Sequence, residues 1–218
     1  MTSTVLITGC SSGIGAATVR HFAAQGWNVA ATLRDPAAAH FEDSAGKVAS
    51  FALDVTDPQS VDAAVAQAVE RFGHIDVLIN NAGYGLFGPF ETATQEVIER
   101  QFQTNVFGVF AVTRAVLPHM RERAGGVIIN VASLTGLVAM PLYSLYAASK
   151  FAVVGFSESL SHELAPLGIR VKVFAPGAVA TDFSGRSLAR TFEGDGGPYA
   201  DSIRKVMAVF AANRGTSN

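Results

Sequence analysis

Tyr146 and Lys150 are the pair of side chains in this sequence whose spacing most clearly suggests chemistry. They stand four positions apart in Tyr-Ala-Ala-Ser-Lys, so on a helix their side chains share one face. A phenol normally loses its proton near pKa 10, and an adjacent ammonium favours the phenolate and lowers that pKa. The pair therefore predicts proton transfer at Tyr146, from an alcohol or to a ketone. A solvated pair on a helix surface would show the same spacing, so further residues have to support this interpretation.

Two other polar residues are candidates for the same site. Ser133 follows the apolar run 127–131 and precedes the tyrosine by a short stretch, so its hydroxyl can hold a substrate oxygen. Asn105 lies inside a long helical pattern, where asparagine is a poor helix former. Its amide can anchor a water molecule or a backbone group in a proton path. A purely structural hydrogen bond to a helix or to the backbone is an equally good interpretation of Asn105.

A glycine-rich turn directly follows the first apolar run and reads Thr-Gly-Cys-Ser-Ser-Gly-Ile-Gly from Thr8 to Gly15. Glycines let a pyrophosphate approach the backbone closely, and the free N–H groups of the following helix face its charge. The spacing is GxxxGxG, not the commoner GxGxxG, and a tight strand-to-helix connection would be the simpler interpretation. The residues expected to contact the cofactor here are Gly9, Ser11, Ser12, Gly13, Ile14 and Gly15.

The end of the second apolar run predicts which dinucleotide is bound. An acidic side chain there binds the ribose 2′-hydroxyl of NAD, whereas an arginine accommodates the 2′-phosphate of NADP. The sequence has Arg34 at this position, and Ser12 of the glycine turn can add a hydroxyl. We therefore expect NADP, with NAD the less favoured cofactor. A solvated arginine neutralised by Asp35 is the alternative.

Two further strand ends carry polar residues where open α/β sheets bind ligands. Asp54 and Val55 follow the third strand and can meet the adenine, although Asp54 alone is more often a turn or helix-capping residue. Asn81, Ala82 and Gly83 follow the fourth strand. We expect all five residues to contact the cofactor.

The elements that must position these residues alternate between short β-branched runs and longer helical patterns, as in βαβ units around a parallel sheet. Because most of the runs are apolar on both faces, helices should cover both sides of the sheet. The fold class is therefore α/β, with one domain over residues 1–218. The six expected strands are residues 5–8, 28–33, 48–53, 75–79, 127–131 and 170–174.

Helix signals are readable at two places. Asp57 is the expected N-cap of a helix with Pro58 at its first position and an end near Gly73. A longer helix should run over residues 95–123, with Pro118 placed to kink it. Residues 178–218 read as a substrate lid region, and the glycine-rich stretch 193–198 within it reads as a mobile loop.

Composition narrows the function classes. A net charge of −2 provides no field that would gather nucleic acid or an anionic membrane surface. No apolar stretch of the chain approaches a bilayer-spanning length, and no secretory signal is apparent. Cys10 is the single cysteine and cannot form an internal disulfide, so a cytoplasmic location is expected. We expect no nucleic acid, membrane or metal partner.

Taken together over roughly Thr4 to Thr181, these motifs resemble the short-chain dehydrogenase/reductase family. The glycine turn with Ala-Thr-Leu-Arg-Asp at residues 31–35 is especially similar to NADP-using hydroxysteroid dehydrogenases and related ketone reductases. The residues that carry the resemblance, in the order and spacing of the family, are Thr8 to Gly15, Asp54, Asn80 to Gly83, Asn105, Ser133, Tyr146 to Lys150, Pro176, Gly177 and Thr181.

The resemblance implies a doubly wound, Rossmann-type sheet in three α/β/α layers and hydride transfer at the nicotinamide. It implies a catalytic tetrad of Asn105, Ser133, Tyr146 and Lys150, with Lys150 also on the nicotinamide ribose and Tyr146 also among the cofactor contacts. The stretch with Pro176, Gly177, Val179 and Thr181 is expected to lie against the nicotinamide. The predicted function is NADP-dependent interconversion of a secondary alcohol and a ketone or aldehyde, with Tyr146 as general acid and base.

The sequence leaves several points open. Relative to the family, a final helix and strand are absent after Asn218, which suggests a truncated C-terminus. A homo-oligomer, either a dimer or a tetramer, is a separate expectation. A non-catalytic NADP-binding sensor or scaffold is the main alternative, and an epimerase or dehydratase that uses nicotinamide transiently is another. Small apolar carbonyl compounds or alcohols are the expected substrates, because apolar residues crowd the predicted loops: Leu86, Phe87, Val138, Met140, Leu142, Phe183 and Leu188.

Overall fold

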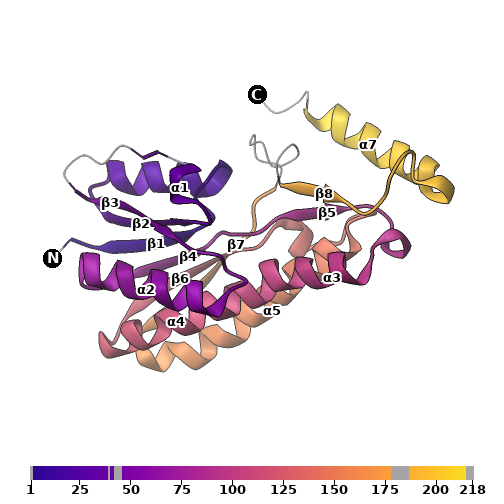
Figure 1. Cartoon of the computed structure of the whole chain (residues 1–218). Coiled ribbons are helices and arrows are strands. Elements are labelled where there is room, and N and C mark those ends of the chain that lie inside the picture. Colours follow the sequence, from indigo (N-terminus) through magenta and orange to yellow (C-terminus); the bar gives the residue numbers. More distant parts are fainter. Residues whose placement is uncertain (1, 39, 42–45, 178–186, 215–218) are drawn as a thin grey trace.

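The central element is a parallel sheet of six strands. The computed structural model of the chain describes residues 2–38, 40–41, 46–177 and 187–214. The strand order is β3-β2-β1-β4-β6-β7, and every pair is parallel (Figure 1). The strands are β1 (Thr4–Thr8), β2 (Asn28–Leu33), β3 (Val48–Ala52), β4 (Val77–Asn80), β6 (Gly126–Val131) and β7 (Ile169–Phe174).

The chain reverses its direction of winding between β1 and β4. From β1 it proceeds outward to β2 and β3, and it then returns to β4 on the other side of β1 before continuing to β6 and β7. In sheets wound this way, ligands bind outside the carboxyl ends of the strands at the reversal. The expected α/β fold with a doubly wound sheet in a single domain is confirmed.

Helices cover both faces of the sheet, as expected (Figure 1). The helix α1 (Gly13–Ala24) lies on one face, and α2 (Pro58–Phe72), α4 (Gly108–Glu122) and α5 (Ser144–Leu164) lie on the other. Asp57 caps α2 by accepting a hydrogen bond from the Gln59 N–H at 3.0 Å. Gly73 ends α2 with a φ of 82°, so both boundary predictions for this helix are confirmed.

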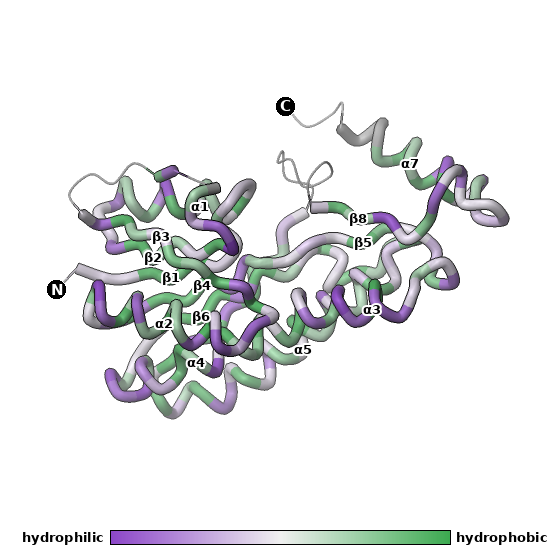
Figure 2. Tube along the Cα trace, in the orientation of Figure 1, coloured by the Kyte–Doolittle hydropathy of each residue, from purple (hydrophilic) through white to green (hydrophobic). Residues whose placement is uncertain are grey.

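Two apolar cores, one on each side of the sheet, hold these layers together. Figure 2 shows the corresponding concentration of hydrophobic residues along the central strands. On the side of α2, α4 and α5, Leu6, Leu78 and Ile128 are buried with Val65 and Val112. On the side of α1, a second cluster buries strand residues of β1, β2 and β4 together with Val19. The alternate residues of one strand therefore stabilise opposite layers.

The long helix expected over residues 95–123 is not continuous. It consists of α3 (Gln95–Phe102), a π-helical turn (Gln103–Phe107) and α4, and Pro118 lies inside α4. The prediction failed at the π-helical turn because Asn105 is fully buried there and its amide is engaged by groups outside the helix. Such turns recur at functional sites.

The two edge strands differ from the expectation of uniformly apolar strands. In β3 and β7 buried or half-buried residues alternate with exposed ones, such as Ser50, Arg170 and Lys172, because each edge strand has a neighbour on one side only. Boundaries shift slightly as well, since the third strand ends at Ala52 and the fourth runs from Val77 to Asn80.

A small second sheet was not expected. It pairs β5 (Gly85–Phe87) in parallel with β8 (Leu188–Arg190), and it leads into α7 (Ala200–Arg214), which lies beyond this pair (Figure 1). Residues 193–198, expected as a mobile loop, include a turn at Gly196 that leads into the short helix Gly197–Tyr199. The other short 3-10 helices are Pro36–Ala38, Phe90–Thr92, Leu134–Gly136 and Ala165–Leu167.

Within the described ranges, none of the helices combines the length and apolar character that crossing a bilayer requires.

Candidate active site

Tyr146 and Lys150 lie in the first turns of α5 and share one face of it. Both are buried, with 7% of Tyr146 and 5% of Lys150 exposed. The Lys150 Nζ lies 5.9 Å from the centre of the Tyr146 ring, and it donates a hydrogen bond to the Val131 carbonyl at 2.8 Å. The ammonium is therefore fixed at the end of β6, beside the phenol.

The pKa of Tyr146 differs from the prediction made from the spacing. Burial raises the pKa of the Tyr146 phenol above its usual value of 10.0, and a hydrogen bond with the Ser133 side chain lowers it by less. Burial also lowers the pKa of Lys150 from 10.5 to about 8. The expected lowering of the phenol pKa is therefore wrong for the chain by itself, because desolvation of the phenol outweighs its hydrogen bond with Ser133.

Ser133 follows β6 and turns its hydroxyl toward Tyr146. It is the N-cap of the short helix Leu134–Gly136, and its Oγ accepts a hydrogen bond from the Thr135 N–H at 3.2 Å. The same Oγ lies 3.0 Å from the Thr135 hydroxyl and is hydrogen-bonded to Tyr146. Two hydroxyls, of Ser133 and Tyr146, thus lie together at the carboxyl end of the sheet.

Asn105 reaches this site through its neighbours. Its Oδ1 accepts from the Tyr84 N–H at 3.0 Å, and its Nδ2 donates to the Tyr84 carbonyl at 2.9 Å and to Ser149 Oγ at 3.2 Å. Ser149 Oγ in turn donates to the Tyr146 carbonyl at 2.7 Å. Of the two interpretations left open for the side chain, these contacts support the structural hydrogen bonds. Asn105 ties the segment after β4 to the helix that carries Tyr146.

The glycine turn forms a cradle in which side chains would not fit. Gly9 and Gly13 have φ angles of 72° and 57°, a region that residues with a Cβ avoid. A Cβ at Gly9 would lie 2.8 Å from Ala82 Cα. A Cβ at Gly15 would collide with the Gly9 carbonyl and lie 2.6 Å from Asn81 Nδ2. The glycines therefore let this turn pack closely against Asn81 and Ala82 of the segment after β4.

The first turn of α1 points into this cradle. Ser12 is its N-cap residue, and its side chain accepts no hydrogen bond from the first turn. An anion can take the place of such a cap, because the N-terminal N–H groups carry partial positive charge. Ser11 is exposed beside the turn, and Ile14 is half-buried within it. The residues present thus fit the phosphates of a dinucleotide.

The segment after β4 is fixed against the glycine turn. Thr8 Oγ1 accepts hydrogen bonds from the N–H groups of Asn81 at 3.0 Å and Ala82 at 2.9 Å. Asn81 Nδ2 donates to the carbonyls of Thr8 at 2.8 Å and Gly9 at 3.0 Å. A Cβ at Gly83 would lie 3.0 Å from Asn105 Oδ1 and 3.6 Å from Lys150 Nζ. Gly83 therefore brings the cofactor segment next to the catalytic candidates.

Arg34 lies exposed just after β2, and no carboxylate in the described part of the chain lies within ion-pair distance of its guanidinium. Asp35, the neutralising partner in the alternative interpretation of Arg34, instead accepts a hydrogen bond from the Ala37 N–H at 3.0 Å. Asp54 is half-buried, and its Oδ1 accepts from the Thr56 N–H at 2.9 Å and from the Thr56 hydroxyl at 2.7 Å. These bonds, and to a smaller extent the charge of Arg34, lower the pKa of Asp54. Asp54 thus closes a turn, the simpler of its two expected roles.

The remaining candidates occupy the same edge of the sheet. Val55 packs against Gly108 at the start of α4, where a Cβ would lie 2.7 Å from it. The Pro176 carbonyl accepts from the Leu134 N–H at 2.9 Å, next to Ser133. Gly177 is exposed. Val179 and Thr181, expected against the nicotinamide, lie outside the described residues, as does Phe183.

A buried polar network beneath the site was missed by the sequence analysis. Asn80 Nδ2 donates to Thr113 Oγ1 and to Asn130 Oδ1, both at 2.9 Å, and Asn130 Nδ2 donates to Ser157 Oγ at 2.8 Å. The network links β4, β6, α4 and α5. The sequence did carry a signal for it, because Asn80 and Asn130 each belong to an otherwise apolar strand. A buried amide requires hydrogen-bond partners, so two such residues predict a polar network.

Comparison with known proteins identifies this arrangement. The sequence model described as short chain dehydrogenase matches residues 3–191. The chain belongs to the short-chain dehydrogenase family. It is accordingly an oxidoreductase acting on CH–OH groups with a nicotinamide dinucleotide as acceptor, and the resemblance noted from the motifs is confirmed.

Individual members of the family cover most of the chain. A 3-ketodihydrosphingosine reductase of Bacteroides thetaiotaomicron is 41% identical over 205 residues, which are 94% of this chain and 74% of the reductase. The crystal structure of a short-chain dehydrogenase from Streptomyces avermitilis has a TM-score of 0.85 and 36% identity, covering 92% of this chain and 74% of that one. The crystal structure of a 3-ketoacyl-(acyl-carrier-protein) reductase from Brucella melitensis, complexed with NADH, has a TM-score of 0.80 and 34% identity. It covers 87% of this chain and 86% of that one.

Proposed function

We propose that the chain is an NADP-dependent oxidoreductase that interconverts a secondary alcohol and a ketone or aldehyde, with Tyr146 as general acid and base. One observation carries the proposal most directly. The buried Tyr146 phenol is hydrogen-bonded to Ser133 and has the Lys150 ammonium 5.9 Å from its ring centre, beside a glycine cradle suited to a dinucleotide.

The proposed proton transfer follows from the pKa shifts. A nicotinamide held by these residues would supply the hydride to the carbonyl carbon in reduction and would accept it in oxidation. For ketone reduction, Ser133 Oγ holds the carbonyl oxygen, and the Tyr146 O–H bond breaks as its proton passes to that oxygen. Because burial raises the pKa of Tyr146, the phenol is protonated at neutral pH and ready to act as the acid. The Lys150 ammonium then stabilises the resulting phenolate, and oxidation runs through the same groups in reverse.

The cofactor proposal assigns each part of the dinucleotide to residues of this chain. The turn from Gly9 to Gly15 would hold the pyrophosphate, and Asn81 to Gly83 with Lys150 would meet the nicotinamide ribose. Arg34 favours NADP, since its forked guanidinium is exposed without a carboxylate partner among the described residues and matches a phosphate dianion. Solved structures similar to this chain hold NADH, NADP or NAD, so the preference rests on Arg34.

The proposed substrate is an apolar carbonyl compound or alcohol. Leu86 and Leu145 are buried against Tyr146, and the exposed Leu137 and Val138 follow Ser133 closely in the chain. The similar reductase from Bacteroides thetaiotaomicron is named for a ketone of a long-chain lipid base. Both observations favour a hydrocarbon substituent on the substrate.

A spectrophotometric screen of NADPH oxidation over a panel of apolar ketones and aldehydes tests the proposal. Active substrates are then assayed with Tyr146→Phe, which we expect to lower kcat by about 10²–10⁴-fold while the Kd for NADPH stays within about twofold. Tyr199→Phe serves as the matched control, because it removes a tyrosine hydroxyl that donates a hydrogen bond to Glu91 and does not contact Ser133 or Lys150. Ketone reduction at the wild-type rate in Tyr146→Phe would rule out the mechanism. Silence of the wild type across the panel would favour the sensor alternative.

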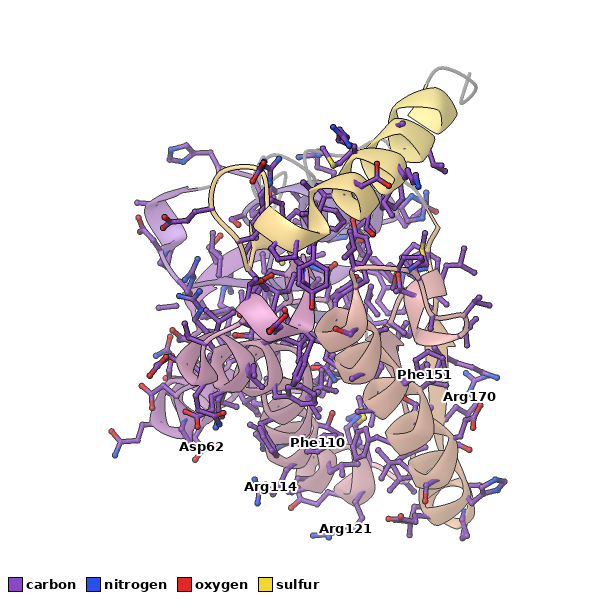
Figure 3. The ribbon with its side chains drawn as sticks, turned by 90° about the vertical axis from the view of Figure 1, so that its right-hand side faces the viewer. Asp62, Phe110, Arg114, Arg121, Phe151 and Arg170 are labelled. Atoms are coloured by element: carbon purple, nitrogen blue, oxygen red, sulfur yellow. The ribbon has the colours of Figure 1, made fainter. Side chains whose placement is uncertain are left out.

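We also propose a homo-oligomer formed through the outer face of α4 and α5. Figure 3 labels Phe110 on α4 and Phe151 on α5. Phe107, at the end of the π-helical turn before α4, and Phe151 are exposed by 51% and 44%, and exposed aromatic rings that lie close together mark candidate interfaces. Light scattering should give a mass above that of one chain, and Phe151→Glu should reduce it. A cytoplasmic location stays a prediction.

A further inference from the structure

Tyr143 connects the catalytic tyrosine with the C-terminal part of the chain. It is the N-cap residue of α5, and its ring centre lies 6.1 Å from that of Tyr146. The same ring lies 5.2 Å from Phe87 of β5 and 5.9 Å from Phe210 of α7, the latter edge-on at 81°. One half-buried aromatic ring thus contacts the small sheet, α7 and the reacting group.

The backbone before Tyr143 is held in an unusual conformation. Leu142 has a φ of 64°, a region that non-glycine residues adopt rarely and only where the surrounding structure imposes it. Its carbonyl accepts a hydrogen bond from the Gly88 N–H at 2.8 Å. A side chain at Gly88 would collide with Thr191, so this contact depends on the glycine. The position of the Tyr143 ring is therefore built into the fold.

Among the described residues, apolar surface remains exposed on α7, the helix that contacts this ring. In α7, Ile203, Val206, Met207 and Phe210 recur at the spacing of one helix face. Ile203 is buried and Phe210 contacts Tyr143, yet Met207 on the same face is 44% exposed. The described chain thus leaves part of an apolar face open at the edge of the aromatic group formed by Phe87, Tyr143 and Phe210.

We propose that Tyr143 is a specificity-determining residue and that its ring, with Phe210, binds the hydrocarbon part of a long-chain or otherwise bulky apolar ketone. The polar side of Tyr146 faces Ser133 and Lys150, where the carbonyl oxygen would lie. The side of Tyr146 that faces Tyr143 is lined by aromatic and aliphatic groups. A long hydrocarbon group of a substrate would contact this side, whereas a small ketone would be too short to reach it. This inference rests on the proposed function and adds the substrate class and the residue that selects it.

The experiment measures kcat and KM with NADPH over a homologous series of methyl ketones from butanone to undecanone. We expect kcat/KM of the wild type to rise along the series. Tyr143→Ala should lower kcat/KM for undecanone at least about tenfold, mainly through KM, and for butanone less than about threefold. Tyr143→Phe keeps the ring and should retain the wild-type preference. Phe90→Ala removes an exposed ring, 61% accessible, and is the matched control.

The outcomes separate the two proposals. Equal losses for butanone and undecanone in Tyr143→Ala would show a structural role and overturn the inference, as would a wild type indifferent to chain length. The Kd for NADPH and the melting temperature report whether the fold is intact, and Tyr143→Leu replaces the alanine variant if that one unfolds. A wild type that reduces no ketone contradicts the proposed function itself, and the inference falls with it.

Discussion

The Lys150 ammonium lies 5.9 Å from the centre of the Tyr146 ring and donates to the Val131 carbonyl at 2.8 Å. Burial nevertheless shifts the pKa of each group toward its neutral form, raising the pKa of Tyr146 and lowering that of Lys150 to about 8. As the pH rises, Lys150 therefore loses its proton at a lower pH in the folded chain than in the unfolded chain.

This shift predicts a pH-dependent stability. Between pH 8 and 10.5 the unfolded chain keeps a proton on Lys150 that the folded chain has released, so the free energy of unfolding should rise with pH. The lowered pKa corresponds to a gain of about 3 kcal/mol, which is complete above pH 10.5 and is lost progressively as the pH falls from 10.5 to about 8. Urea unfolding of the wild type and of Lys150→Met across this range isolates the contribution, because other groups titrate alike in both. Parallel curves would contradict the assignment.

Arg34→Ala should weaken the binding of NADPH and leave the binding of NADH nearly unchanged. Loss of a charged contact to the 2′-phosphate is worth about 1.4 kcal/mol or more, which raises the Kd for NADPH at least about tenfold. The Kd for NADH should change less than about twofold. Arg20→Ala, at an exposed position on α1, controls for the loss of one positive charge. Equal effects on both cofactors in a fluorescence titration would refute the role of Arg34.

The glycine cradle predicts opposite results for two similar substitutions. Gly15→Ala places a Cβ against the Gly9 carbonyl and Asn81, so cofactor binding should fall by more than about tenfold and the melting temperature should drop. Gly155→Ala, inside α5 with nothing within 4 Å of the added Cβ, should stabilise the protein by about 0.5–1 kcal/mol. Thermal unfolding and NADPH titration of both variants measure the difference. Similar behaviour of the two would remove the steric argument.

Asn130→Ala should lower the free energy of unfolding by about 2–4 kcal/mol. The substitution leaves a fully buried cavity and deprives Asn80 of one of its two acceptors. Asn28→Ala removes a half-buried amide with a single 3.4 Å contact to Thr4, and it should cost less than about 1 kcal/mol. Denaturant unfolding at one pH compares the two, and equal losses would argue against the network.

The parallel sheet and the edge that carries the site could be predicted from the sequence, because those features repeat locally. The apolar runs place five of the six strand starts to within one residue, and Asp57, Pro58 and Gly73 predict the boundaries of α2. Ser133 follows one strand of the sheet, and Tyr146 and Lys150 lie in the helix that comes next. Because the carboxyl ends of parallel strands share one edge of the sheet, their positions in the sequence already imply that the three residues lie together.

What the sequence could not show depends on contacts between distant segments. The π-helical turn at Asn105 exists because of Tyr84 and Ser149, which no local pattern relates to it. The pairing of β5 with β8 joins short segments that have no strand periodicity of their own. The pKa of Tyr146 is set by how deeply the phenol is buried, and the spacing of a tyrosine and a lysine carries no measure of that depth.

The small sheet has a consequence for the order of folding. Thr191 Oγ1 donates to the Pro89 carbonyl across 102 positions of sequence, and β8 contributes only three residues to its pairing with β5. Closing so long a loop costs entropy that few hydrogen bonds repay, so this contact should form after the main sheet and open before it. Hydrogen exchange should then find the amides of β8 exchanging through local unfolding while those of β1 and β4 are still protected.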